Sequence, residues 1–544
     1  MRFAKIKIAQ IKDSMNNKKL QVWLPLLFSM VIIIGIWIGY TIKSRMPNTG
    51  IFFTEKRRPV QEVIDLIENK YVDEKNYDSL NEAAINAILN QLDPHSILLA
   101  GADLQQAKED LQGGFSGIGV EFNIYNDTIN IIHVIKDGPS EKAGLQTGDK
   151  FLKVGDSTVA GTKITTEKIK FLLRGKGGSK TIVTVLREKE IKQVTVTRGM
   201  IPLNSLDAAY MITKEVGYVR LNKFSETTYH EFMDATLQLQ KQGMQSLILD
   251  LRDNGGGILT EATNIADEFL DKDKLITYTE GKHFPKKEYR CQKDGIFEKG
   301  KLVILANEGT ASASEIIIGA LQDWDRATII GRRTFGKGLV QEQYELSDGS
   351  GLRLTIARYY TPLGRSIQKS YSQGIKIYQQ DLTNRFTDGE LIYVDSIKHT
   401  NGKIFTTKAG KTVYSGGGIT PDIFVPVDTT TGYNKNLRKI YEKGIINNFV
   451  YRNYVANKNK FAEYASPKDF EKNYIVDANT WNDFKILAQQ DSINLNGITP
   501  VEKVALAHQI KTAAARQIWR TEGFYEVSNA DDPMIKKALE ILSK

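Results

Sequence analysis

The chain has 544 residues, 41% of them hydrophobic and 25% charged, which is the composition of a globular protein of several domains and excludes a disordered or fibrous one. Its single cysteine, Cys291, excludes an intramolecular disulfide bond and any metal site built on several thiolates. The net charge of +9 is small for this length, and the basic residues are spread among acidic ones, so the charge does not indicate nucleic-acid binding.

The first feature along the chain is an uncharged apolar segment, residues 22–42, VWLPLLFSMVIIIGIWIGYTI. As a helix it would span roughly 30 Å, the thickness of bilayer hydrocarbon. Basic residues dominate the preceding segment, so the positive-inside rule predicts that residues 1–21 are cytoplasmic and that the chain after residue 42 is exported. A cleaved signal peptide is the alternative, although the run is long for one and no small-residue cleavage site precedes Met46.

The remaining chain divides by its hydrophobic pattern into four parts. Helical periodicity predicts two helices within residues 59–92, in an N-terminal helical part over 56–112. A compact domain over 113–200 is expected to hold strands 117–125, 129–135, 149–154, 180–187 and 191–198, with helices near 140–143 and 165–173. Residues 201–428 alternate as strand 215–221, helix 227–242, strand 246–250, helix 260–270, strand 301–306, helix 312–324 and strand 327–331, which predicts α/β layers. Residues 429–544 are mostly helical in pattern.

Three familiar catalytic patterns are absent or incomplete. There is no G-x-S-x-G elbow, and HEFMD at 230–234 has Asp234 where a zinc protease needs its second histidine. GRRTFGKG at 331–338 nearly matches a phosphate-binding loop. However, Gly338 replaces the Mg²⁺-binding hydroxyl, and the following LVQEQYEL alternates as a strand where a phosphate-binding helix should begin. A nucleotide site is therefore not favoured.

The segment TASASEIIIGALQDW at 310–324 places Ser312 at the start of a predicted helix. Small neighbours leave its hydroxyl accessible, and the backbone N–H of Ala313 would point outward from the helix terminus toward an oxyanion. Helix starts also favour serine as an N-cap, and taken alone Ser312 is better explained in that way.

Lys337 and Gln341 favour a catalytic role for this serine. In the strand predicted after Gly336, residues four apart share one face, so the amide of Gln341 can orient the amine of Lys337. A lysine is a general base only when it is deprotonated, which requires burial among apolar residues to lower its pKa. Phe335, Leu339 and the isoleucines of the serine helix supply such surroundings.

With these residues in view, the chain resembles the C-terminal processing peptidases, or tail-specific proteases, a family of Ser/Lys serine peptidases. The resemblance runs from about residue 60 to 427 and rests on LDPHS at 92–96, DLRDNGGG at 250–257, TASASE at 310–315, TFGKGLVQ at 334–341, ARYYTPLGRSIQ at 357–368 and GGGITPD at 416–422. Residues 370–415 depart from the family pattern and look like an insertion, and so does the helical region after residue 430.

The resemblance implies a role for each residue of the site. It implies that Ser312, rather than Ser314, is the nucleophile, that Lys337 is the base and that Gln341 orients it. It assigns the oxyanion N–H groups to Ala313 and to the turn of Gly256 and Gly257, without deciding which glycine donates. Asp250 and Arg252 are interpreted as supports of that turn.

The compact domain resembles a PDZ domain inserted before the catalytic core. GIGV, which is Gly117, Ile118, Gly119 and Val120, matches the loop that binds a terminal carboxylate, while the strand from Val120 pairs with the peptide. AGLQTGDKFLKVG at 143–155 is a second typical stretch. The alternative is that these glycines only form hairpin turns. In relatives the domain also gates the catalytic site, and Arg174 is the expected contact residue.

Together these features predict a multidomain α+β protein with a single N-terminal transmembrane helix, a PDZ-like domain, a crotonase/Clp-protease-like α/β core and a helical C-terminal extension. The predicted function is that of a serine endopeptidase, anchored in the bacterial inner membrane with its body in the periplasm or otherwise outside the cytoplasmic membrane, which cleaves near the C-terminal tails of proteins. No metal or other cofactor is expected. The expected partners are protein or peptide tails and the membrane; an adaptor protein and a homo-oligomer are left open. The alternative is a non-catalytic envelope scaffold that binds tails.

Overall fold

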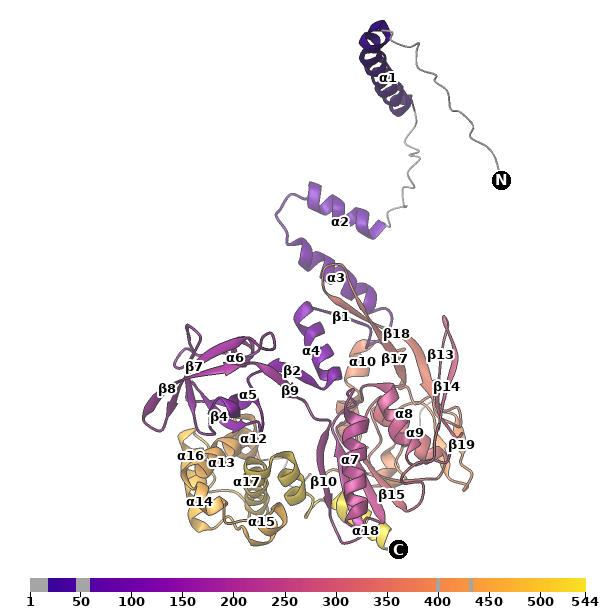
Figure 1. The fold of residues 1–544 in the computed structure, drawn as a ribbon. Coiled ribbons are helices and arrows are strands. Elements are labelled where there is room, and N and C mark those ends of the chain that lie inside the picture. The colour runs from indigo at the N-terminus through magenta and orange to yellow at the C-terminus, as the bar shows by residue number, and fades with distance from the viewer. Residues whose placement is uncertain (1–17, 46–58, 398–401, 430–433) are drawn as a thin grey trace, which may run out of the picture. The chain divides into compact units, whose positions relative to one another are not determined.

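The computed structural model describes residues 18–45, 59–397, 402–429 and 434–544 (Figure 1). It divides into two units, residues 1–84 and 85–544, and each is described by itself. Most of the predicted cytoplasmic tail, residues 1–17, lies outside the described residues.

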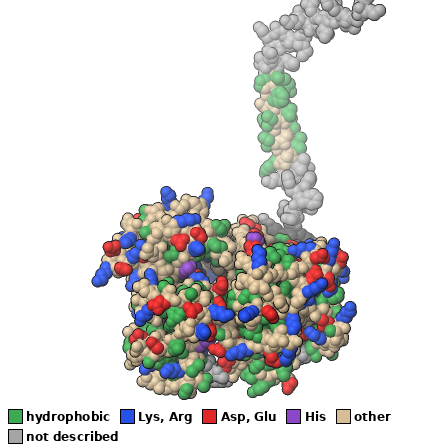
Figure 2. Space-filling view, turned by 60° about the horizontal axis from the view of Figure 1, so that its bottom comes forward, with side chains coloured by type: hydrophobic (Ala, Val, Ile, Leu, Met, Phe, Trp, Pro, Cys, Tyr) green, Lys and Arg blue, Asp and Glu red, His purple; other side chains and the backbone are tan. Residues whose placement is uncertain are grey.

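The first unit contains α1 (Lys18–Arg45), α2 (Pro59–Lys70) and the start of α3 (Tyr77–Leu89). The segment Trp23–Thr41 of α1 is long and apolar enough to cross a membrane, a property that a signal sequence shares. Its hydrophobic side chains are exposed, and they form the green column of Figure 2. On the face of the second unit that Figure 2 shows, basic and acidic side chains are interspersed.

The second unit is built around a six-stranded sheet in the order β10-β11-β12-β15-β16-β21. Its strands are β10 (Leu206–Met211), β11 (Val216–Leu221), β12 (Ser246–Asp250), β15 (Lys301–Ala306), β16 (Thr328–Gly331) and β21 (Ile423–Phe424). The strands from β11 to β21 run parallel, and β10 is antiparallel to β11. The central strands β12 and β15 are buried at nearly every residue, as is usual for parallel strands with both faces covered.

Helices cover the two faces of this sheet. One face packs against α7 (Thr228–Lys241), α8 (Leu259–Asp267) and α9 (Ala313–Asp323), and the other packs against α18 (Pro533–Ser543). Along β12, Leu247 and Leu249 face the first group while Ile248 faces α18, because successive side chains of a strand point to opposite faces. All these elements except β10, β21 and α18 match predicted elements to within a few residues.

A second sheet, whose neighbouring strands are all antiparallel, contains Gln341, and one of its strands begins two residues after Lys337. It consists of β1 (Ile97–Leu99), β18 (Gly351–Tyr360), β13 (Leu275–Gly281) and β14 (Phe284–Arg290) in that order, with β17 (Leu339–Glu345) also paired to β18. The predicted insertion contains α10 (Ile375–Gln379), α11 (Asp381–Thr387), a 3₁₀ turn (Val394–Ser396) and the strand pair β19 (Ile404–Thr406) and β20 (Thr412–Tyr414).

The compact domain has its own hydrophobic core. Its sheet runs in the order β3-β4-β5-β7-β8, with β6 beside β5, and a separate pair joins β2 to β9. The elements are β2 (Gly114–Gly117), β3 (Val120–Tyr125), β4 (Thr128–Val134), α5 (Pro139–Lys142), β5 (Lys150–Val154), β6 (Ser157–Thr158), α6 (Thr166–Leu173), β7 (Lys180–Arg187), β8 (Glu190–Thr197) and β9 (Gly199–Pro202). The single strand predicted over 117–125 is wrong, because Gly119 has a φ of +77° and separates β2 from β3.

The C-terminal region is helical, as predicted. A separate hydrophobic core joins α12 (Lys435–Glu442), α13 (Ile445–Ala456), α14 (Lys458–Phe461), α15 (Pro467–Asn473), α16 (Ala478–Gln490) and α17 (Pro500–Ser528). We call residues 435–528 the helical extension. α18 does not belong to this core, since it packs on the six-stranded sheet. The polar helix α4 (Gly101–Gln112), in which only Leu104 is buried, lies within the predicted helical part over 56–112, but its pattern does not mark it as a separate helix because it lacks a clear apolar face.

Candidate active site

The candidate site lies where three neighbouring parallel strands end. β12 leads into the turn of Gly256 and Gly257, β15 leads into the loop of Ser312, and β16 leads into the loop of Lys337. The carboxyl ends of parallel strands meet at one edge of a sheet, which is where open α/β sheets place their ligands. The three sequence motifs therefore come together although they are far apart in the chain.

A cavity of about 590 Å³ occupies this edge. Its lining contains every residue expected to act as nucleophile, base or oxyanion donor and the one expected to orient the base, namely Gly256, Gly257, Ser312, Ala313, Lys337 and Gln341. The rest of the lining includes Asp110 of α4, Ile316 of α9, and Arg353 and Tyr359 of β18. Among the described residues there is no group of three or more His, Cys, Asp and Glu side chains arranged for a metal ion.

Ser312 precedes α9 in a strained backbone conformation, with φ +58° and ψ −117°. A positive φ is uncommon for a residue other than glycine, and such strain is typical of functional sites. The neighbouring turn packs tightly on it, since a Cβ atom at Gly256 would lie 2.7 Å from the Cβ of Ser312. Only glycine fits at that position.

Glu315 links the serine loop to the lysine loop, and sequence analysis assigned it no role. Its carboxylate is fully buried. Its Oε2 accepts the backbone N–H groups of Ser312 and Lys337 at 2.9 Å each, and its Oε1 accepts the N–H of Gly336 at 2.8 Å and the hydroxyl of Thr334 at 2.5 Å. Burial raises the pKa of Glu315 to about 6, and these four donors oppose that shift. The signal was present in the sequence as the acidic residue at the third position of the helix.

The amine of Lys337 is mostly buried and has no hydrogen-bond or ion-pair partner among the described residues. Burial lowers its pKa, and the positive charge of Arg353 lowers it further, while Glu315 and Asp93 act in the opposite direction. A lysine in this environment gives up its proton more readily than an exposed one, as a general base must.

Gln341 lies on β17, whose pairing with β18 shifts by a residue between Val340 and Gln341. Its side-chain N–H donates to the carbonyl oxygen of His95 at 2.6 Å, which ties β17 to the LDPHS segment. Its carbonyl oxygen has no donor among the described residues. The role of Gln341 in orienting Lys337 stays a prediction, with this oxygen as the atom that would accept from the amine.

Two backbone N–H groups beside Ser312 have no partner among the described residues, those of Ala313 and Gly257. The N–H of Gly256, by contrast, donates to the side-chain oxygen of Asn254 at 2.9 Å. Of the two glycines, Gly257 is therefore the one with an available donor. Gly257 has a φ of +147°, and a Cβ atom there would lie 2.0 Å from the carbonyl oxygen of Phe224, so this position also requires glycine.

Asp250 and Arg252 do not line the cavity. Asp250 is fully buried and accepts from Arg252 at 2.6 Å, from Arg220 at 3.0 Å and from the hydroxyl of Tyr218 at 2.7 Å. Although burial opposes its ionisation, the two arginines hold the pKa of Asp250 well below its usual value. Arg252 also pairs with Asp532 at the start of α18. These contacts anchor the end of β12, as a supporting role requires.

The insertion supports the loop that carries Lys337. The sequence did not predict this support. Arg385 of α11 is buried and donates to the carbonyl oxygens of Arg333, Thr334 and Phe335 at 2.9–3.2 Å. Arg333 in turn pairs with Glu390 at 2.6 Å. Three consecutive carbonyls of the loop are thus held by one side chain from the insertion.

The predicted carboxylate loop joins β2 to β3. The backbone N–H groups of Ile118 and Gly119 have no partner among the described residues. The carbonyl oxygen of Ile118 accepts the N–H and the hydroxyl of Ser140, which fixes the loop on α5. Gly117 ends β2 opposite Gly199, and Val120 begins β3.

Arg174 lies at the end of α6, beside β2. Its guanidinium pairs with Glu109 of α4 at 2.9 Å and stacks on the ring of Phe115, 4.4 Å from its centroid. Its side chain therefore faces α4 and lines neither the catalytic cavity nor the groove along β3.

Comparisons with known proteins identify three parts of the chain. The model of peptidase family S41 matches residues 215–377, a PDZ domain model matches residues 116–197, and a family of unknown function, DUF8443, matches residues 436–520. A probable CtpA-like serine protease of Staphylococcus haemolyticus is 34% identical over 365 residues, which cover 65% of this chain and 73% of the relative. One of Staphylococcus epidermidis (strain ATCC 12228) is 32% identical over 373 residues, which cover 67% and 74%.

Among solved structures, the photosystem II D1 C-terminal processing protease is 26% identical, with a TM-score of 0.33 over 67% of this chain and 92% of that chain. The identity and coverage of the staphylococcal relatives are high enough to establish the family. The chain belongs to the CtpA-like serine proteases of peptidase family S41, and it is a serine-type C-terminal processing peptidase with a PDZ domain.

Proposed function

We propose that this protein is a membrane-anchored envelope endopeptidase that binds the carboxyl-terminal tail of a protein substrate at its PDZ domain and cleaves near that end with a Ser312/Lys337 dyad. The observation that carries the proposal is that one cavity is lined both by Ser312, in a strained conformation, and by Lys337, whose pKa is lowered by burial. Membership of the family supports the same reaction.

In the first half of the reaction, the neutral amine of Lys337 takes the proton of the Ser312 hydroxyl as the oxygen attacks the scissile carbonyl. The negative charge on the carbonyl oxygen is stabilised by the N–H groups of Ala313 and Gly257. The Lys337 ammonium then gives its proton to the leaving amine. The peptide C–N bond breaks and an ester to Ser312 remains.

In the second half, Lys337, neutral again, takes a proton from water while the water oxygen attacks the ester. The tetrahedral intermediate expels the Ser312 oxygen, which receives the proton back from Lys337, and the new carboxylic acid leaves. Gln341 orients the amine through its side-chain carbonyl oxygen, and Glu315 holds the two loops in place.

The PDZ domain selects the substrate by its terminus. The unpartnered N–H groups of Ile118 and Gly119, within the loop from Gly117 to Val120, are suitable donors to a terminal carboxylate. The tail then extends along β3 as an added strand. Arg174 of the PDZ domain pairs with Glu109 of α4, and the next residue of α4, Asp110, lines the catalytic cavity. Tail binding can therefore be coupled to the catalytic cavity through α4.

The apolar helix α1 supports anchoring by residues 22–42 in the inner membrane, with residues 1–21 cytoplasmic and the body outside the cytoplasm. We place the N-terminal helical part at 56–112, the PDZ domain at 113–200, the peptidase core at 201–428 with its insertion at 370–415, and the helical C-terminal region at 429–544. The parallel sheet flanked by helices supports a crotonase/Clp-protease-like description of the core.

The proposal is tested with the full-length protein in detergent and peptides that end in a free acid or in an amide. Ser312→Ala should abolish cleavage, whereas Ser314→Ala, which removes a buried hydroxyl bonded to the Asn254 carbonyl at 3.0 Å, should keep most of it. The acid peptide should be cleaved at least about 10-fold faster than the amide, because charge-assisted hydrogen bonds are lost with the amide. Full activity in Ser312→Ala would refute the dyad. Tail binding without any cleavage by the unaltered protein would indicate a scaffold.

A further inference from the structure

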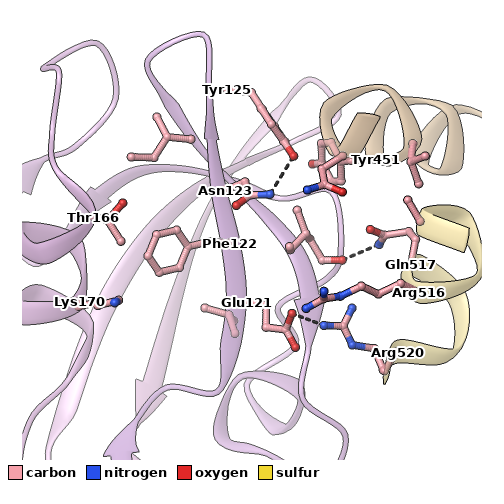
Figure 3. A pocket seen from close by; sticks show the side chains of 16 residues that line it. Glu121, Phe122, Asn123, Tyr125, Thr166, Lys170, Tyr451, Arg516, Gln517 and Arg520 are labelled. Carbon is pink, nitrogen blue, oxygen red and sulfur yellow. Dashed lines mark hydrogen bonds and ion pairs between the residues drawn. The ribbon is translucent and has the colours of Figure 1, made fainter. Parts of the chain in front are cut away.

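A second cavity, of about 600 Å³, lies between the PDZ domain and the helical extension (Figure 3). Strand β3 and helix α6 of the PDZ domain line it on one side, and α13 and α17 of the extension line it on the other. In Figure 3, Thr166 and Lys170 lie to the left of β3, and Tyr451, Arg516, Gln517 and Arg520 lie to its right. The groove expected to receive the tail thus has a wall from outside the PDZ domain.

Strand β3 has a free edge in this cavity. Among the described strands it is the end strand of its sheet and pairs with β4 alone. An unpaired edge offers a row of backbone donors and acceptors to a further strand. A tail whose terminus is held by the loop before Val120 would lie along β3 in the opposite direction, with its earlier residues toward Tyr125.

The side chains of β3 alternate between the two walls. Val120, Phe122 and Ile124 pack on the core of the PDZ domain. Glu121 instead pairs with Arg520, and the ring of Tyr125 lies 5.5 Å from that of Tyr451 of α13. Side chains of an added strand would alternate in the same way, so every second residue of the tail would face the helical extension.

Two further contacts fix the extension beside the PDZ sheet. Gln517 donates to the carbonyl oxygen of Ile132 at 2.7 Å, and Lys458 donates to that of Thr147 at 3.2 Å. Arg520 interrupts the helical geometry of α17 with a φ of +61°, and its side chain meets Glu121. A non-glycine residue held at positive φ needs support from its surroundings, and the ion pair with β3 provides it.

The cavity is positively charged. Its lining contains three cationic side chains, those of Lys170, Arg516 and Arg520, and one carboxylate, that of Glu121. Glu121 is already paired with Arg520. Arg516 is exposed and has neither an ion pair nor a hydrogen bond with any described residue, so its guanidinium is available to a ligand.

We propose that the helical extension is the outer wall of the tail-binding groove and that Arg516, assisted by Arg520, selects substrate tails with an acidic side chain at the positions that face it. If the last side chain of the tail points to the PDZ core, these are the penultimate residue and the fourth from the end. The inference rests on the proposed binding of tails along β3. It gives the region matched by DUF8443 a function in substrate choice.

Binding is measured in the full-length Ser312→Ala protein, so that no cleavage occurs, with fluorescent octapeptides ending in a free acid. The peptides differ only in having Glu, Gln or Lys at the penultimate position. We expect Glu to bind about 5- to 10-fold more tightly than Lys, from partly exposed charge pairs. Arg516→Gln should reduce this ratio to about 2-fold or less, and Arg516→Glu should reverse it. Arg438→Gln, an exposed site elsewhere on the extension, is the matched control and should leave the ratio unchanged.

Moving the Glu through the last four positions tests the alternation, because only the penultimate and fourth-from-last positions should respond to Arg516→Glu. Equal affinity for the three peptides, or a preference that survives Arg516→Glu, would overturn the inference. Such a result would leave the proposed function intact if the unaltered protein still cleaves these tails. Selective binding without cleavage by the unaltered protein would instead refute the proposed function alone.

Discussion

The backbone N–H groups of Ser312 and Lys337 donate to one oxygen atom, Oε2 of Glu315, at 2.9 Å each. The candidate nucleophile and base are thereby held by a common acceptor, although 25 positions separate them in the chain. The distance between their loops is set by this carboxylate, which neither reacts nor lines the cavity.

Glu315→Gln should therefore lower activity by displacing the loops that carry Ser312 and Lys337. One acceptor oxygen becomes an NH₂ group that faces N–H donors, and we expect kcat to fall about 10- to 100-fold with little change in KM. The free energy of unfolding should fall by about 1–3 kcal/mol, because buried donors lose their acceptor. Glu215→Gln, at an exposed site of the same core, is the control. Unchanged kcat in Glu315→Gln would exclude the positioning role.

Glu315 also predicts a dependence of stability on pH. Burial raises its pKa from 4.5 to about 6, so the native state binds this proton more tightly than the unfolded state. Its contribution to the free energy of unfolding is full below pH 4.5 and is lost as the pH rises through about 6. Urea unfolding between pH 4 and pH 7 should show this decline in the unaltered protein and not in Glu315→Gln, which cannot ionise.

Activity should depend on the ionisation of Lys337. Because burial and Arg353 lower its pKa, kcat/KM should rise with pH along one ionisation whose midpoint lies below the ordinary lysine value of 10.5. Arg353→Gln removes a neighbouring positive charge, so the midpoint should move to higher pH. Arg358→Gln, an exposed arginine of the same strand, should leave it in place. If both variants have the same midpoint as the unaltered protein, Arg353 does not contribute to the lowered pKa of Lys337.

Gln341→Ala should cost less than loss of the nucleophile, because Gln341 positions groups and does not react. We expect kcat to fall about 10-fold, because the amine loses the acceptor proposed for it and the carbonyl oxygen of His95 loses its donor. Gln341→Glu would place a carboxylate beside the amine and should move the activity midpoint to higher pH. A purely structural role would change stability without moving that midpoint.

The insertion should matter for catalysis although it lies outside the cavity. Arg385→Met leaves three carbonyls of the lysine loop without their donor, and we expect a loss of about 2–4 kcal/mol in the free energy of unfolding and a lower kcat. Lys376→Met, at an exposed position of the same insertion, is the matched control. Equal kcat in the two variants would mean that the loop holds its geometry without Arg385.

The apolar helix predicts a membrane topology that can be measured in intact cells. Protease added to spheroplasts should remove the body and leave a small membrane-bound fragment, since residues 1–21 are expected in the cytoplasm. A released, soluble body of full activity in untreated cells would indicate a cleaved signal sequence. Protection of the body in intact spheroplasts would contradict the export of the chain.

The sequence by itself determined the parts of this protein that depend on local pattern and on recognisable motifs. Uniform hydrophobicity over 22–42, alternation in the PDZ strands and the β/α succession of the core follow from side-chain periodicity, which a sequence displays directly. Ser312, Ala313, Lys337, Gln341 and the two glycines were identified because they lie within short motifs, and they share one cavity because their strands are neighbours in a parallel sheet.

Tertiary structure alone decided what lies between distant segments. The bonds of Glu315 to the lysine loop, of Arg385 to the same loop and of Gln341 to His95 join residues 19–246 positions apart, and no periodicity encodes such pairs. The position of Arg516 is a further example. Arg516 lines the groove along β3 because the hydrophobic core of the helical extension lies beside that of the PDZ domain. Local pattern specifies which face of an element is apolar; which partner covers that face is settled by the whole chain.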